Sequence, residues 1–513
     1  MRWFKRGLIG LVSTLAVTYA VLAFITREPT RPVVTLPRAG KLMLVGVTVV
    51  DPRTGALQPG MTVLMDAGKI VRVAADAPVV GADVQRVDAT GKFVVPGFND
   101  MHAHPLNNAD PSGDFALMLA NGITGFRQMS GSDAMLRNRA ERRLSITADA
   151  PALLALPGPL LTPLTASKPE QARETIRRQH AAGADFVKTA FVSEPVLIAA
   201  LDEARRLGIP LDGHVPGGME VASAAAKGMR AIEHLGASNG LLFSCSSRGK
   251  AILANVASTT ATPTVPAFNS RIIAKLAEWS FAKLVINPTA ADHDMGGVAP
   301  TRAALASFDE ARCRRQIALI NTAGSWHVPT LIRLKTIYTA ADPVFARDPN
   351  LRYMPADTVE KWREVTASFT ATYSPAERDV LRASYLASLR IVKLLDQQGT
   401  RMLAGSDASG SGWEVPGFAL HRELDELARA GLSPLRILQM TTIDAAEFLG
   451  RTATMGSVAA GRNADLVLLD ADPTKDVANL HRVAGVVRGG FYHDAARLAA
   501  LQERVAQGRG YLR

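Results

Sequence analysis

The sequence contains little cysteine, with only Cys245 and Cys313 in a chain of 513 residues. Two cysteines cannot build the disulfide framework on which small secreted domains depend, so a hydrophobic core must stabilise this fold. The sequence leaves open whether the two cysteines pair, because pairing requires Cα atoms within about 7 Å of each other.

The sequence also lacks any concentration of basic residues, although its formal net charge is +11. No predicted helix carries a basic stripe, no basic patch is interleaved with aromatic residues, and no zinc-finger spacing occurs. These absences disfavour a nucleic-acid partner and leave a small-molecule substrate as the expected ligand. A basic surface could lie against anionic lipid, but an ordinary basic globular protein needs no such partner.

Charged residues are absent from positions 7–26, which follow three basic residues near the amino terminus. As a helix this stretch spans roughly 30 Å, the thickness of a bilayer's hydrocarbon core. It exceeds a typical signal-peptide core, so residues 1–29 are expected to be an uncleaved membrane anchor, with a cleaved signal as the alternative. The preceding basic residues place the body on the extracytoplasmic, periplasmic side. The proline-rich residues 30–40 form the expected tether.

Short apolar runs separated by turn residues occur at both ends of the chain, over 41–92 and 456–495. This texture indicates short strands and hairpins, so the two ends are expected to form one composite β-sandwich. Residues 93–455, between them, alternate strand with helix. Residues 496–513 are expected to form a carboxy-terminal helix.

The middle segment predicts a (β/α)8 TIM barrel, an α/β fold whose active site lies at the carboxyl ends of its strands. Several helices end in a glycine suited to a left-handed residue, namely Gly183, Gly208, Gly228 and Gly399. The eight candidate strands are 93–99, 123–128, 151–156, 184–191, 209–214, 230–234, 326–331 and 401–406.

Two of the expected crossovers, 235–325 and 332–400, are long enough to be insertions over the barrel mouth. The second is rich in aromatic residues and is interpreted as a lid or substrate wall. The alternative is that these rings pack the inserted helices against each other. The aromatic residues are Tyr338, Phe345, Tyr353, Trp362, Phe369, Tyr373 and Tyr385.

The segment FVVPGFNDMHAHP, residues 93–105, ends an apolar run with His102 and His104 at alternate positions. Alternate residues of an extended chain point to the same side, so both imidazoles can reach one metal ion. An isolated pair of this kind is about as often two solvated loop histidines. The remaining predicted strand ends decide between these interpretations.

Other predicted strand ends carry further metal-ligand types: His214, His234 and Asp407, the last in GSDAS. Lys188 lies inside the predicted strand 184–191 among apolar residues, where an unpaired ammonium would be costly to bury. Carbon dioxide would convert its amine into a carbamate, an anion able to bridge two metals. Each residue alone has an ordinary structural explanation, but together they favour a metal site.

These motifs resemble those of the amidohydrolase superfamily. The resemblance covers residues about 41 to 495 and includes GFNDMHAH, GHVPGG, AIEHL, GSDAS and the late segment GSVAAGRNADLVLLD. The spacing is similar to that of imidazolonepropionase-like enzymes and metal-dependent Xaa-Pro dipeptidases. Residues 125–129, GFRQM, depart from the Arg-Asp pair that relatives often show at the second strand end.

The resemblance implies a binuclear centre, usually of zinc, although cobalt, manganese or nickel suit the same donors. It also implies that Asp407 carries the proton during catalysis. The implied ligands are His102 and His104 on the more buried ion, His214 and His234 on the other, carboxylated Lys188 bridging both, and Asp407.

Two cations that share a water lower its pKa towards neutrality and polarise the scissile carbonyl, and Asp407 would pass the proton to the leaving amine. The expected function is hydrolysis of an amide bond, in a dipeptide or N-acyl amino acid. Lactones and phosphotriesters are alternative substrates for such a centre. A catalytically silent metal-binding surface protein is the competing hypothesis, but a scaffold has no need of the proton carrier Asp407.

Overall fold

The computed structural model describes residues 33–508 except 38, 109, 145, 148–149, 238, 260–282 and 292–296, together with Thr14, Val17, Thr18 and Val21. Among these described residues, no helix is long and apolar enough to cross a membrane. The anchor or signal expected over 7–26 lies outside the described residues apart from those four helical positions. It therefore stays a prediction.

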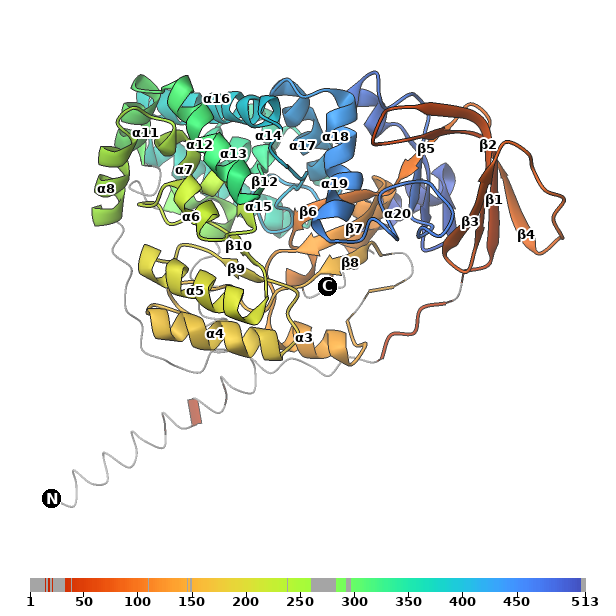
Figure 1. Ribbon diagram of the computed structural model, residues 1–513, viewed down its shortest axis with the longest axis horizontal. Coiled ribbons are helices and arrows are strands. Elements are labelled where there is room, and N and C mark those ends of the chain that lie inside the picture. The colour runs from red at the N-terminus through yellow and green to blue at the C-terminus, as the bar shows by residue number, and fades with distance from the viewer. Residues whose placement is uncertain are drawn as a thin grey trace, which may run out of the picture.

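The two ends of the chain meet in one eight-stranded mixed sheet. Its strands are β1 (Lys41–Val50), β2 (Leu57–Asp66), β3 (Lys69–Ala74), β4 (Val84–Asp88), β5 (Phe93–Pro96), β13 (Leu466–Leu469), β14 (Val483–Arg488) and β15 (Phe491–Asp494). Their order is β15-β14-β13-β5-β1-β2-β3, with β4 also paired to β1. Figure 1 shows the first strands of this sheet, in red and orange, at one end of the molecule.

Strand β5 joins the two parts of this sheet, because it pairs parallel to β1 and antiparallel to β13. Alternate residues such as Leu42, Leu44, Val94, Leu466 and Leu468 contribute to one buried cluster. Both chain ends therefore contribute strands to one sheet, and the composite β-sandwich domain expected over 41–92 and 456–495 stays a prediction.

The predicted strand 93–99 is wrong in its bounds, since it is two strands that belong to different sheets. Phe93–Pro96 is β5, whereas Phe98–Ala103 is β6, which carries His102 and ends directly before His104. Gly97 separates the two strands. A Cβ atom on Gly97 would lie 1.9 Å from Thr124 Oγ1, so any larger residue would clash with β7.

Two parallel sheets form the middle of the fold. The first contains β6, β7 (Ile123–Gln128) and β8 (Ala152–Ala155); the second contains β9 (Val187–Thr189), β10 (Leu211–Gly213), β11 (Ala231–Glu233) and β12 (Trp326–Val328). Apart from the split first strand, the strands predicted from 123 to 331 are confirmed within their predicted bounds. The chain thus has an α/β fold with mixed and parallel sheets.

Backbone hydrogen bonds outside the named strands connect these two sheets. Leu161 N donates to Lys188 O at 2.9 Å on one side. On the other side, Leu403 N donates to His327 O and Met101 N donates to Ala404 O, each at 2.9 Å. The strand predicted over 401–406 is reduced to an isolated bridge between His327 and Met402.

Helices follow most of the parallel strands and cover their outer faces (Figure 1). Gly183, Gly208, Gly228 and Gly399 all have a positive φ, as predicted. The helices are α2 (Ser112–Ala120), α3 (Asp133–Ala140), α4 (Pro169–Ala181), α5 (Glu194–Leu207), α6 (Val221–Ala226), α7 (Gly240–Ser244), α8 (Gly249–Thr259), α10 (Pro288–Ala291), α11 (Val298–Ala306), α12 (Glu310–Ala323), α13 (Leu331–Tyr338), α14 (Pro343–Ala346), α15 (Ala356–Thr372), α16 (Pro375–Gln397), α17 (Phe418–Arg429), α18 (Pro434–Thr441), α19 (Ile443–Phe448) and α20 (Ala495–Ala506). Short 3-10 turns are η1 (Pro105–Asn107), η2 (His234–Gly236), η4 (Pro349–Tyr353) and η5 (Val477–His481).

The aromatic residues of the second insertion are all buried, so they do not present a substrate wall. Trp362 lies 5.7 Å from Trp413 between ring centroids, and Phe369 lies 5.1 Å from Tyr373. The packing interpretation is therefore the correct one for these side chains. The insertion is an added helical layer, and four of its aromatic residues, Tyr338, Phe369, Tyr373 and Tyr385, join the main hydrophobic core.

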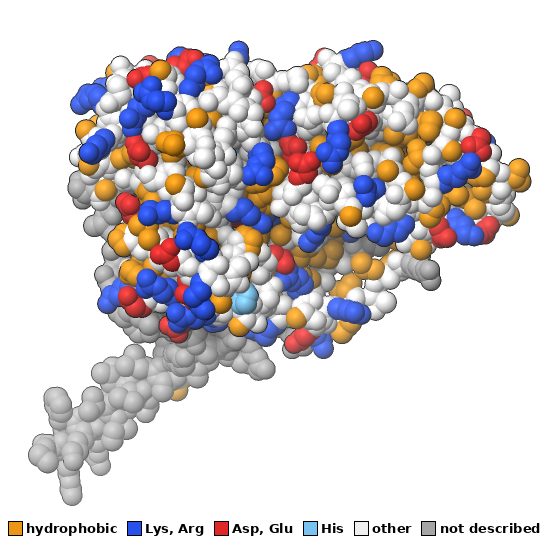
Figure 2. All heavy atoms as spheres, in the orientation of Figure 1, with side chains coloured by type: hydrophobic (Ala, Val, Ile, Leu, Met, Phe, Trp, Pro, Cys, Tyr) orange, Lys and Arg blue, Asp and Glu red, His pale blue; other side chains and the backbone are white. Residues whose placement is uncertain are grey.

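Lysine and arginine side chains are dispersed over the face shown in Figure 2, and aspartate and glutamate side chains lie among them. This dispersion agrees with the scattered arginines of the sequence. The expected absence of a nucleic-acid partner stays a prediction.

Cys245 and Cys313 form a disulfide, which settles the question that the sequence left open. Cys245 directly follows α7, Cys313 belongs to α12, and both are fully buried. The bond closes a loop with a sequence separation of 68 residues. It thereby ties the beginning of the first insertion to α12, which lies near the end of that insertion.

Replacing both cysteines by serine should lower the free energy of unfolding. In the chain-entropy model, a loop of this length is worth about 4 kcal/mol. Chemical denaturation of the double variant Cys245→Ser/Cys313→Ser measures the difference. The wild type in reductant is the matched control and should resemble the variant; equal stability of oxidised and reduced protein would contradict the prediction.

Candidate metal centre

A buried carboxylate, Asp100, holds the end of β6, which carries His102, against the segment that carries Asp407. Asp100 Oδ1 accepts from the backbone N of His102 at 3.2 Å and from that of Ser406 at 3.0 Å, while Oδ2 accepts from Ser406 Oγ at 2.6 Å. Gly405 permits this approach, because a Cβ there would lie 2.6 Å from His102 Cβ. Burial raises the pKa of Asp100 to about 6.

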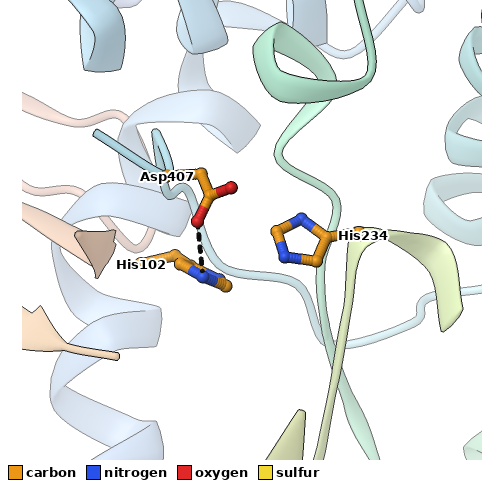
Figure 3. A group of neighbouring side chains, drawn as sticks. All are labelled: His102, His234 and Asp407. Atoms are coloured by element: carbon orange, nitrogen blue, oxygen red, sulfur yellow. Dashed lines mark ion pairs between the residues drawn. The ribbon is translucent and has the colours of Figure 1, made fainter. Parts of the chain in front are cut away.

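Asp407 is where the site's ring nitrogens converge. Its Oδ1 lies 2.9 Å from His102 Nε2 and 3.0 Å from His104 Nε2. His102, His234 and Asp407 each offer one ligand atom, and these atoms all lie within 4.8 Å of one another. Figure 3 shows Asp407 above the ring of His102, with the ring of His234 facing them from a different strand.

The other residues expected in the site lie beside this group. Lys188 Nζ is 2.9 Å from His102 Nε2. The ring centroid of His234 is 4.7 Å from that of His102 and 5.0 Å from that of His214. The structure therefore brings together every side chain that the sequence nominated, from five separate places in the chain.

Burial keeps the imidazoles of His104, His214 and His234 in the neutral form, which is the form that binds a metal. It lowers the pKa of His104 to about 4 and that of His214 to about 3, and it lowers the pKa of His234 well below its usual value. Burial also lowers the pKa of Lys188 to about 8, which brings the neutral amine within reach near physiological pH.

Hydrogen bonds to the Nδ1 atoms orient three of these rings. His102 Nδ1 lies 2.6 Å from Glu233 Oε2, His104 Nδ1 lies 2.8 Å from Ser130 Oγ, and His234 Nδ1 contacts Thr330 Oγ1. The Nε2 atom of each ring is then left for the centre, as is usual for metal-ligating histidines. His214 Nδ1 is buried without a hydrogen-bond partner among the described residues.

These donors fit a divalent metal. The cluster contains imidazoles, a carboxylate and a buried ring nitrogen that has no hydrogen-bond partner among the described residues. Burying these polar groups together without a bound ligand would cost free energy. Mixed nitrogen and oxygen donors suit zinc among the common metals.

Left-handed backbone conformations gather at the same strand ends. Phe191, His234, Thr330 and Asp407 have φ values of +60°, +53°, +46° and +63°. Each costs of order 1–3 kcal/mol in a residue other than glycine, and such strain persists only where the surroundings enforce it. The fold thus holds these side chains in fixed directions at one edge of its sheets.

A buried ion-pair network beneath the histidines was not foreseen from the sequence. Arg127 donates to Met101 O at 2.6 Å, to Asp212 at 3.1 Å and to Glu233 at 2.6 Å, and the side chains of Arg127, Asp212 and Glu233 are all inaccessible. The rings of Phe186 and Phe448 lie 5.4 Å and 5.0 Å from its guanidinium. The sequence drew attention to Arg127 only as part of the segment 125–129, which departs from the pattern of relatives. In the structure its side chain is buried.

Glu233 connects this network to the centre. Burial would raise its pKa, but Arg127 and His102 hold the pKa well below the usual value, so Glu233 is an anion. A carboxylate that accepts from His102 Nδ1 fixes the tautomer with a free Nε2 lone pair. Charged residues inside predicted strands, at 127, 212 and 233, were the signal that could have revealed the network.

Arg333 of α13 is a further contact of the centre that the sequence did not indicate. Its Nε lies 3.2 Å from Asp407 Oδ2. Its Nη1 and Nη2 atoms donate to Ile286 O at 2.8 Å and Val285 O at 2.6 Å. Because the guanidinium is fixed on both sides, it restrains the orientation of Asp407.

A family model, curated relatives and solved structures resemble this chain in sequence or in fold. Residues 383–491 match the model of the amidohydrolase family. A stretch of 64 residues is 47% identical to a dihydroorotase of Pelotomaculum thermopropionicum, which covers 12% of this chain and only 14% of that protein. The curated relative is therefore matched over a small part of its length.

Solved structures match over nearly the whole chain. Bottromycin amidohydrolase gives a TM-score of 0.63 at 24% identity, covering 96% of this chain and 93% of that chain. A Xaa-Pro dipeptidase with bound methionine in its active site gives 0.57 at 14% identity, covering 88% and 100%. At these identities the likeness establishes a shared fold.

Replacing Glu233 by glutamine should weaken both the fold and metal binding. The change leaves the buried Arg127 short of one carboxylate, and breaking a buried pair typically costs about 3–5 kcal/mol. It also frees the tautomer of His102, which should lower metal affinity about 10–100-fold. Denaturation and equilibrium dialysis against zinc measure the two effects.

The matched control is Glu170→Gln, because Glu170 lies on α4 with 78% of its side chain exposed. It should change neither quantity. Wild-type zinc affinity in Glu233→Gln would show that the carboxylate does not orient His102.

Proposed function

We propose that the chain is a member of the amidohydrolase superfamily and a metal-dependent hydrolase with two divalent ions, zinc being the best match to its donors. The observation that carries this proposal is the convergence of the ring nitrogens of His102 and His104 on Asp407 Oδ1. The proposed ligands are His102, His104, Lys188, His214, His234 and Asp407.

The same membership supports closure of the two parallel sheets into the expected (β/α)8 barrel. The hydrogen bonds at Leu161 and Lys188, and those that run from His327 through Leu403 and Ala404 to Met101, support this closure. In such a barrel the strand ends that carry the proposed ligands surround one mouth.

When bound, the ions supply a nucleophilic water of lowered pKa and polarise the scissile carbonyl. Asp407 does the proton transfer. Its Oδ1 faces the histidines, while Oδ2 forms an ion pair with Arg333 and accepts a hydrogen bond from Ser411 Oγ at 3.4 Å. Asp407 takes the proton from the attacking water and returns it to the leaving nitrogen.

We propose an amide as the substrate, in a dipeptide or an N-acyl amino acid. The structural likeness to an amidohydrolase and to a Xaa-Pro dipeptidase supports this class. A panel of dipeptides, N-acyl amino acids, lactones and phosphotriesters, assayed with the zinc-loaded protein, tests it. Turnover confined to lactones or phosphotriesters would reject the amide, and no turnover would favour a silent metal-binding protein.

We further propose that the body lies in an oxidising compartment outside the cytoplasm, next to the membrane. The disulfide between Cys245 and Cys313 supports this, because such bonds are rare in reducing compartments. A free-thiol assay on protein taken from cells under alkylating conditions tests the compartment. Two free thiols would contradict it.

Asp407→Asn should keep the fold and at least part of the metal while losing turnover. Acid–base assistance is typically worth about 10²–10⁴ in rate, and the loss should appear mainly in kcat. Asp202→Asn is the matched control, since Asp202 lies on α5 with 58% of its side chain exposed. Full metal content with near-normal kcat would remove Asp407 from the role of proton carrier.

Lys188 should carry a carboxyl group, because only a carbamate anion can join two cations. Lys188→Ala should bind less metal and be almost inactive, and acetate should restore part of both. Lys188→Arg, which keeps the cation but forms no carbamate, should not respond to acetate. An unmodified Lys188 in a metal-loaded crystal would replace the binuclear proposal with a mononuclear one.

A further inference from the structure

Phe191 is exposed although phenylalanine is normally buried. The residue is 52% exposed to solvent. Among the described residues, no other phenylalanine or tryptophan is exposed. Its neighbours Ala190 and Val192 are buried, at 5% and 4%. The chain on both sides is therefore anchored in the core while the aromatic ring is held outside it.

The exposed ring lies against the proposed metal centre. Phe191 comes three residues after Lys188, and its ring meets that of His214 edge-on, with 5.1 Å between centroids and an interplanar angle of 89°. Its backbone has a φ of +60°, which a bulky residue rarely adopts. The fold thus keeps a strained conformation to place an aromatic ring beside a proposed ligand.

A second exposed apolar side chain lies on the Asp407 side of the centre. Val285 is 53% exposed, and its carbonyl oxygen accepts from Arg333, the residue that contacts Asp407. Its Cγ1 lies 3.5 Å from the position of a Cβ on Gly410, three residues after Asp407. Exposed apolar side chains thus lie beside His214 and beside the segment that follows Asp407.

We propose that Phe191, together with Val285, determines specificity by packing against an apolar side chain of the substrate beside the scissile bond. This inference rests on the proposed amide hydrolysis and narrows it to amides with a bulky apolar or aromatic group. Covering half of an exposed aromatic ring with an apolar group removes that surface from water, which is favourable and largely independent of the chemistry at the metals.

The test uses the metal-loaded full-length protein and the variant Phe191→Ala. Its first arm compares kcat/KM for N-acetyl amino acids and Xaa-Pro dipeptides whose side chain is that of glycine, leucine or phenylalanine. The wild type should favour the phenylalanine substrate over the glycine one, and the variant should lose about 10–100-fold of that preference, mainly through KM. Metal content should be that of the wild type.

The second arm does not depend on turnover. Calorimetry compares acetohydroxamate with benzohydroxamate, which share a metal-binding group and differ by the ring. The wild type should bind benzohydroxamate more tightly, and Phe191→Ala should bind the two alike. Phe191→Gly, which suits a φ of +60°, guards against misfolding and should behave the same way, whereas Leu319→Ala, at an exposed position on α12, should change nothing.

The two arms separate the inference from the function on which it rests. No turnover of any amide, with a ring preference that Phe191→Ala abolishes, would overturn the proposed reaction and keep the apolar subsite. Turnover with a side-chain preference unchanged in both Phe191 variants would overturn the subsite and keep the reaction. A wild type that binds neither hydroxamate would count against both.

Discussion

The buried guanidinium of Arg127 is the constraint on which the centre depends. A cation deep in the protein is tolerable only when its charge and donors are matched, and here a backbone carbonyl and two carboxylates match them. One of those carboxylates, Glu233, is thereby fixed as an anion and determines which nitrogen of His102 faces Asp407. Arg127 and Glu233, which lie beneath the site, therefore determine the orientation of the His102 ring.

Much of this arrangement is visible in the sequence, because strand periodicity and strand-end position are local properties. The alternate histidines at the end of β6, the glycines that end helices and the strands from 123 to 331 were all predictable in this way. The first strand was not. An apolar run continues from Phe93 into β6, and only pairing with strands distant in sequence, β13 for β5 and β7 for β6, shows that the chain changes sheets there.

Residues that act through distant partners were the ones that sequence reasoning missed. Arg127 and Glu233 are 106 positions apart, and the residues around them do not indicate that the two form an ion pair. Arg333 lies inside α13, a helix in which apolar residues predominate, and nothing in its sequence marks the arginine as a contact of the centre. Phe191 looked like one more apolar residue of a strand, and only its left-handed backbone and its exposure distinguish it. The aromatic residues of the second insertion, by contrast, suggested a lid or substrate wall, but in the structure they are packed in the hydrophobic core.

The composite sheet imposes an order on biosynthesis. Pro96 pairs with Leu466, so one edge of β5 has no partner until almost the whole chain has left the ribosome. At typical elongation rates that interval is on the order of tens of seconds. Throughout it, the apolar residues Phe93 to Val95 present open backbone donors and acceptors, the kind of edge along which chains associate. A chain truncated before β13 would leave this edge of β5 without its partner strand.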